Sequence, residues 1–296
     1  MAITRVTQKM MLQTSMESLQ GQLARLARTQ EQISTGRQLN RPSDSPTGVS
    51  VAMRLRASLA DQDQYSRNAE DGLGWLGQID TVLSTVTDQV RRSRDLALQG
   101  ASTGANSVAA RDALATELEQ IREGLIASAN ANYLGRPVFG GITSGSLAFD
   151  SNGVYVGTPG AVNRTIGEGV TIRVDVDGAA VFGAAGSTLF QQLDDLVTAL
   201  RTTDQAGIQT GLTALNQALS RVTAVMADVG TRFGRVESAN QLAKDATLGL
   251  TTSLADVEAT DLPRATVDLH MQEMAYQAAL SATARVTQPT LLEFLR

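Results

Sequence analysis

The side chains that could perform catalysis are few and scattered in this sequence. His270 is the only histidine, so a Ser-His-Asp triad or a histidine metal site would have to be built around it. It lies among Leu269, Met271 and Met274 in a helical pattern, and we interpret it as a packed or solvated residue. Because the chain has no cysteine, a thiol nucleophile, a thiolate zinc site and a disulfide framework are excluded.

The other polar motifs also favour structural roles. Asp150-Ser151-Asn152-Gly153 faintly resembles a calcium loop, but the remaining ligand positions are missing, and Asn-Gly is typical of hairpin turns. The glycines at 140–141 and 167–169 lack the strand-loop-helix context of a phosphate loop. The adjacent carboxylates Asp194-Asp195 lie on a predicted helix. We find no catalytic constellation, and we expect neither a cofactor, nor a metal, nor enzymatic activity.

The elements that would position a site are mostly long helices. Near the N-terminus, residues recur at alternating four- and three-residue steps, the spacing of a coiled-coil seam in which Gln30 is the one polar member. The apolar members are Leu12, Met16, Leu19, Leu23, Leu26 and Ile33. We predict a helix over residues 4–35 that ends at Gly36. Ser45-Pro46 then predicts the N-cap and first residue of a second helix.

Further helices are predicted over residues 107–129 and 188–203. The longest regular pattern runs from Ile208 to Val257 with unbroken heptad spacing, which predicts a rod with Leu219 on its buried side. A last helix is predicted from Leu262 and finishes on an apolar tip. Its apolar residues are candidates for an assembly interface: Leu269, Tyr276, Leu280, Leu291, Leu292, Phe294 and Leu295.

Between these helices the hydrophobic period changes from 3.6 to two. Valines and isoleucine alternate with polar residues from Val170 to Asp177, which predicts a half-buried strand. Asn152-Gly153 and Asp177-Gly178 are hairpin-turn dipeptides. We therefore expect residues 138–183 to form a small β domain of several antiparallel strands. We also expect it to be an inserted module whose removal leaves the helical rod folded.

Composition and the chain ends limit the class of function. The net charge of −5 argues against bulk binding of nucleic acid, which needs a basic face. No 18-residue apolar run is present, so we expect no membrane insertion. The N-terminus lacks a continuous apolar core for a cleavable signal peptide. Because a lone amphipathic helix cannot bury its stripe in water, the two helical ends should pair with each other and with neighbouring copies. This pattern favours an assembly protein.

Several motifs then occur in an order that resembles one family. Residues 32–44, QISTGRQLNRPSD, resemble a stretch of the bacterial flagellar hook-associated protein 3 family, within the flagellin superfamily. Ser45 departs from this family, which often has a second Asp there. Similar matches follow at residues 68–76, 94–97, 129–141, 256–261 and 291–295.

The resemblance implies a mainly α fold with a β insertion, arranged as nested domains. The implied domains are a terminal coiled coil (1–41 with 262–296), a helical rod (42–137 with 187–261) and an outward β domain (138–186). It also implies self-association into a ring at the junction of hook and filament. The implied partners are the first hook-associated protein, flagellin and an export chaperone. The implied location is the extracellular flagellum, reached by flagellar type III export without a cleavable signal peptide.

Three alternatives stay open at this point. The closest is flagellin itself, the filament subunit, although Arg41-Pro42-Ser43-Asp44 and residues 135–139 differ from the flagellin pattern. A cytoplasmic signalling coiled coil of the chemoreceptor type shares the heptads but lacks a β insertion. An enzyme is the third and most remote alternative.

Overall fold

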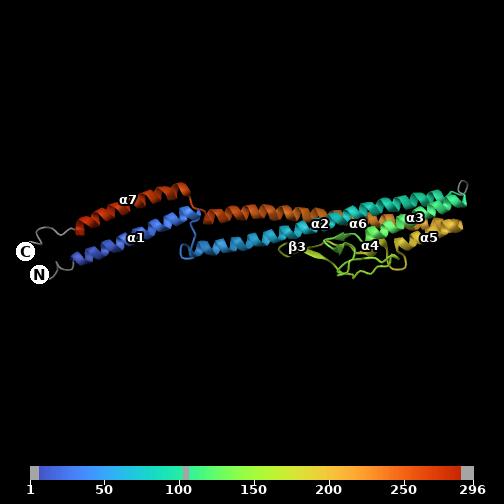
Figure 1. The fold of residues 1–296 in the computed structure, drawn as a ribbon, viewed down its shortest axis with the longest axis horizontal. Helices are drawn as coiled ribbons and strands as arrows, with labels where there is room; N and C mark the ends of the chain where they lie inside the picture. The colour runs from blue at the N-terminus through green and yellow to red at the C-terminus, as the bar shows by residue number, and fades with distance from the viewer. Residues whose placement is uncertain (1–6, 103–106, 288–296) are drawn as a thin grey trace, which may run out of the picture. The chain divides into compact units, whose positions relative to one another are not determined.

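The computed structural model describes residues 7–102 and 107–287 (Figure 1). The chain divides into two compact units, residues 1–60 with 248–296, and residues 61–247. The described helices are α1 (Thr7–Thr35), α2 (Pro46–Ala101), α3 (Val108–Ala129), α4 (Gly178–Phe182), α5 (Leu189–Thr202), α6 (Gln205–Glu258) and α7 (Leu262–Thr287). This confirms the mainly helical fold with a small set of strands. The three-domain division stays a prediction.

In the terminal unit, α1 and α7 lie side by side (Figure 1). The predicted helix boundaries are confirmed by their capping groups. Gly36 follows α1 with a φ of +66°, a conformation that glycine adopts without steric cost. Ser45 accepts a hydrogen bond of 3.1 Å from the amide of Gly48 at the start of α2. Asp261 accepts one of 3.1 Å from the amide of Arg264 and so caps α7.

In the second unit, α2 and α6 run alongside each other (Figure 1). In the same unit, α3 packs against α5. The predicted register of α6 is confirmed, since no seam residue of the second unit is exposed. One member of every heptad is buried: Ile208, Leu215, Val222, Val229, Val236 and Ala243. Between them, Leu212, Leu219, Met226 and Phe233 are half-buried and pack against the same core. Side chains also join the two helices, as in the 2.8 Å hydrogen bond from Ser66 to Asn240.

The segment between α3 and α5 contains less sheet than the sequence predicted. Among the described residues it forms two antiparallel pairs, β1 (Asn132–Tyr133) with β2 (Arg136–Pro137) and β3 (Asn163–Gly167) with β4 (Val170–Arg173). The prediction of a turn at Asp177-Gly178 is wrong. Asp177 instead accepts a 3.0 Å hydrogen bond from the amide of Ala179 and caps α4. An Asx side chain can cap a helix as readily as it can start a turn, and the dipeptide alone does not distinguish the two.

The strand-rich segment shares its core with the helices. Phe149 and Phe182 of this segment contact Phe190 of α5, with ring centres 5.3 and 5.4 Å apart. Fully buried Asp175 pairs with Arg173 at 2.8 Å, and its carbonyl accepts a hydrogen bond from Arg232 of α6. The segment is therefore not a detachable module, and we revise the expectation that its removal leaves the rod folded. Removing it would expose aromatic surface on α5 to water.

Candidate assembly surface

The contact between α1 and α7 is a narrow seam. On both helices its members recur at four- and three-residue steps and are buried or half-buried. On α1 they are Ser15, Leu19, Gln22, Leu26, Thr29 and Ile33. On α7 they are Ala265, Leu269, Gln272, Tyr276, Ala279 and Thr283. Half of the α1 members are polar, so this seam buries much less apolar surface than an all-aliphatic coiled coil of the same length.

The predicted α1 seam is correct at Leu19, Leu26 and Ile33, and the structure places Leu269 and Tyr276 in the facing helix. It is wrong at Gln30, which is exposed, and at Met16 and Leu23, which expose 56% and 51% of their surface. The polar residues one position earlier replace them. Apolar spacing does not predict Ser15, Gln22 and Thr29 as seam residues, because polar pairing across the seam, and not hydrophobicity, favours them there.

An apolar surface therefore remains uncovered on the two terminal helices. Met16 and Leu23 lie one heptad apart on the outside of α1. On α7, Val267, Met271 and Met274 are exposed at four- and three-residue spacing, which places them on one face. Leu280 is also exposed. Apolar side chains repeated along one helix face are typical of a contact with another helix.

Leu12 lies in α1, but its side chain is outside the part that the structure describes. The candidates Leu291, Leu292, Phe294 and Leu295 also lie outside the described residues. The role of all these residues in assembly stays a prediction.

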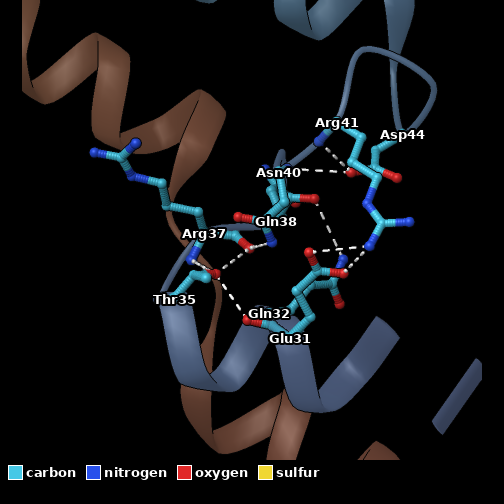
Figure 2. A network of polar contacts seen from close by, with 8 residues as sticks. All are labelled: Glu31, Gln32, Thr35, Arg37, Gln38, Asn40, Arg41 and Asp44. Atoms are coloured by element: carbon cyan, nitrogen blue, oxygen red, sulfur yellow. Dashed lines mark hydrogen bonds and ion pairs between the residues drawn. The ribbon is translucent and has the colours of Figure 1, made fainter. Parts of the chain in front are cut away.

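A polar network holds the loop between α1 and α2 (Figure 2). Oδ2 of Asp44 accepts hydrogen bonds from the amides of Asn40 and Arg41, at 3.1 and 2.8 Å. The Arg41 guanidinium turns back to Glu31 of α1 at 3.1 Å. The side-chain amide of Gln32 donates to the carbonyl of Gln38. These contacts give the residues 32–44 a structural role, because they fix the path by which the chain leaves α1.

The same loop is joined to the turn between α6 and α7. The amide of Gln38 donates to the carbonyl of Glu258 at 2.8 Å, and the amide of Thr260 donates to the carbonyl of Gly36 at 3.0 Å. The buried Glu258 carboxylate lies 2.7 Å from Arg56 and 3.9 Å from Arg37. We call these contacts the polar joint. Neither Glu258 nor Arg56 is predicted from the sequence as a functional contact, and the match at residues 256–261 is the one signal that points to Glu258.

The residues considered for catalysis do not converge. His270 is exposed on α7 and lies 3.5 Å from Glu273. Asp150 closes a turn, where its carboxylate accepts hydrogen bonds from Asn152 and Val154, as the hairpin interpretation predicted. Asp194 pairs with Arg122 at 2.8 Å. Within the described residues, no group of three or more His, Asp or Glu side chains is placed to hold a metal ion. In the described part of the chain, no helix combines the length and the hydrophobicity that a membrane span requires.

Comparisons with known proteins find similarity to flagellar proteins. A family profile described as the bacterial flagellin N-terminal helical region matches residues 6–144. Flagellar hook-associated protein 3 of Escherichia coli K12 is 28% identical over 94% of this chain and 95% of its own length. Flagellin FlaB1 of Treponema pallidum is 23% identical over 90% of this chain and 91% of its own length. The crystal structure of Bacillus cereus FlgL shows the same fold, with a TM-score of 0.61, 22% identity, and coverage of 68% of this chain and 99% of that one.

Proposed function

We propose, on the premise that this chain is related over nearly its whole length to the flagellar hook-associated protein 3 family, that it is a structural junction protein of the bacterial flagellum. In this role, copies of the chain form a ring between the hook and the filament. The ring contacts the first hook-associated protein on one side and flagellin on the other. The chain carries load and makes contacts, and it performs no catalysis.

One structural observation supports this proposal most directly. The terminal helices α1 and α7 bury a seam that is partly polar, while they expose Met16, Leu23, Met271 and Met274 to water. A pair of helices with so little buried apolar surface is marginally stable alone. Contact with terminal helices of neighbouring subunits would cover the exposed residues. The free chain therefore resembles one part of a larger helical assembly.

The runner-up function is the filament subunit itself. Two observations favour the junction over the filament. The full-length identity to the hook-associated protein exceeds that to FlaB1, 28% against 23%. In addition, residues 41–44 depart from the flagellin pattern, and Asp44 within them accepts hydrogen bonds from the amides of Asn40 and Arg41. This departure therefore stabilises the loop between α1 and α2 in this chain.

The proposal includes a route and a location. The chain would leave the cell through the flagellar type III export system, escorted by a chaperone, and would remain outside the cell in the flagellum. The absence of cysteine is compatible with this route, because a chain that is threaded unfolded gains nothing from disulfides in the reducing cytoplasm.

Isolated hooks that carry the first hook-associated protein provide the test. Purified chain is added, and electron microscopy records whether mass appears at the distal hook end. Capping of that end, followed by filament growth when flagellin is added, supports the junction role. Long filaments formed by the chain alone support the flagellin role instead. No binding under any condition would refute both.

A matched pair of variants tests the terminal surface in the same assay. Leu23→Glu places a charge in the exposed apolar face of α1, and we expect it to abolish capping while the free chain keeps its fold. Ser18→Glu adds the same charge at an exposed polar position of the same helix and should retain capping. Equal capping by both variants would mean that the α1 face makes no contact in the assembly.

A further inference from the structure

The hairpin between β1 and β2 carries an unusual residue at its tip. Asn132–Tyr133 pairs with Arg136–Pro137, which leaves Leu134 and Gly135 as a two-residue turn. Both have positive φ, 48° and 79°, as a type I′ turn requires. Glycine, asparagine or aspartate normally occupies both positions, because a larger side chain is strained in this conformation.

Within the free chain, no packing compensates for that strain. Leu134 exposes 80% of its surface, so its apolar side chain points into solvent. The turn is nevertheless held firmly, because Tyr133 packs edge-on against Trp75 of α2 with ring centres 5.5 Å apart. Leu134 is therefore an apolar knob on a rigid base. An exposed apolar side chain in a strained turn destabilises the isolated chain. Its burial becomes favourable only when it contacts another surface.

A recess of matching chemistry lies between α2 and α6. It has a volume of about 310 Å³ and is lined by Gly77, Asp80, Val229, Gly230 and Phe233. A Cβ added at Gly77 or Gly230 would meet no atom within 4 Å. Each glycine costs about 1 kcal/mol relative to alanine inside a helix, and internal packing requires neither. The close approach of a side chain from another molecule is a physical reason for glycine at both positions.

Unpaired charges of opposite sign accompany the knob and the recess. Arg136 follows the turn, with its guanidinium 5.9 Å from the centre of the Trp75 ring, and it has no carboxylate partner among the described residues. Asp80 is exposed at the recess and has no basic partner in that part of the chain either. A second apolar recess, near Leu242, is lined by no charged residue. The positive charge of Arg136 beside the knob therefore favours docking at the recess that carries the negative charge of Asp80.

The knob and the recess are different patches on α2. Trp75 and Gly74 both face Tyr133 of the hairpin, whereas Gly77 lies about 200° from Trp75 and about 60° from Gly74 around the helix axis. Because the two patches differ, one copy can present its knob to one neighbour and its recess to another. Such a heterologous, head-to-tail contact generates rings or helices.

We propose that Leu134 of one copy inserts into the Gly77–Gly230 recess of the next copy, with Arg136 facing Asp80. The partner is a second copy of this chain. The contact rests on the proposed function, because it gives the ring a lateral joint in the 61–247 unit. It is separate from the apolar surface on α1 and α7.

Disulfide trapping tests the contact directly, because the chain has no cysteine of its own. Chains carrying Leu134→Cys and chains carrying Gly230→Cys are mixed, both on hook ends and in concentrated solution, and oxidised. We expect a covalent dimer from the mixture and none from either variant alone. A dimer in solution without hook capping would support the contact while refuting the junction role. Hook capping without a mixed dimer in either setting would overturn the contact alone, and failure of both would overturn both.

Charge reversal supplies a second measurement that does not depend on disulfide geometry. Arg136→Glu alone and Asp80→Arg alone should each raise the concentration of chain needed to form multimers, because each places like charges at the contact. A chain with both substitutions restores opposite charges between copies and should recover wild-type multimer formation. A double variant as defective as the single variants would overturn the pairing.

The glycines give a final distinction from a purely structural role. Gly77→Ala and Gly230→Ala should raise the melting temperature of the free chain through helix propensity, yet reduce multimer formation because they fill the recess. Gly249→Ala, in the same α6 helix and also with open space at its Cβ, should raise the melting temperature without that loss. If the recess variants multimerise as well as Gly249→Ala, the recess is not the docking site.

Discussion

Thr29 and Gln272, which are 243 positions apart in the sequence, share a hydrogen bond in which the Thr29 Oγ1 donates to Gln272 Oε1 at 3.0 Å. It crosses the seam between α1 and α7. A hydrogen bond of this kind contributes about 0.5–1.5 kcal/mol net, but it strongly disfavours registers that leave one partner unpaired. It therefore fixes how the two ends of the chain pair.

We expect Thr29→Val to destabilise the terminal unit by about 1 kcal/mol, because it leaves the Gln272 side chain without this donor. Thr29→Val combined with Gln272→Leu should restore or exceed the original stability by making the seam apolar. Hydrogen exchange of the α1 amides measures both effects. Thr14→Val, at an exposed position of α1, is the control and should change little. A double variant as labile as the single one would show that the hydrogen bond does not fix the pairing.

Two leucines of α6 make a matched pair for testing the second unit. Leu219 is half-buried against the core, whereas Leu242 exposes 69% of its surface. Leu219→Asp should cost several kcal/mol, at least about 3, because it buries an unpaired carboxylate, and Leu242→Asp should stay within about 0.5 kcal/mol. Chemical denaturation of the free chain measures the difference. Equal midpoints for the two variants would contradict the observed register of α6.

Glu258 is the buried carboxylate of the polar joint. Glu258→Gln removes the charge that faces Arg56 and Arg37, and we expect a loss of about 1–2 kcal/mol, since both arginines are half-exposed and partly screened by water. Faster hydrogen exchange at the amides of Gln38 and Thr260 would locate the effect. Glu237→Gln, at an exposed position of the same helix, should leave these amides unchanged.

Burial, reinforced by the negative charges of Asp177 and Asp175, raises the pKa of Tyr155 above its ordinary value of 10.0. A raised folded-state pKa stabilises the fold below the unfolded pKa, and this contribution is lost as pH rises through the folded pKa. Tyr155→Phe should therefore match wild type near pH 7 and lose less stability above about pH 10. Parallel stability curves for the two proteins across the alkaline range would contradict this assignment.

The sequence by itself determined the helices and most of their ends. The Ser45-Pro46 capping signal, Gly36 and the heptads of α6 act through backbone geometry and local periodicity, which a sequence contains completely. The order of the motifs at residues 32–44, 129–141 and 256–261 was also sufficient to indicate the family.

Only the tertiary structure decided which residues of α1 face α7 and how the strand-rich segment packs. Polar pairs such as Thr29 with Gln272 join positions that no local pattern connects, so hydrophobic spacing selected Met16 and Leu23 in their place. Asp177 caps a helix because the chain around it packs against the shared aromatic core, an environment that the dipeptide does not encode. The recess at Gly77 and Gly230 likewise exists only where two helices pass each other. In each case the deciding interactions are long-range, and they form only once the fold has brought distant residues together.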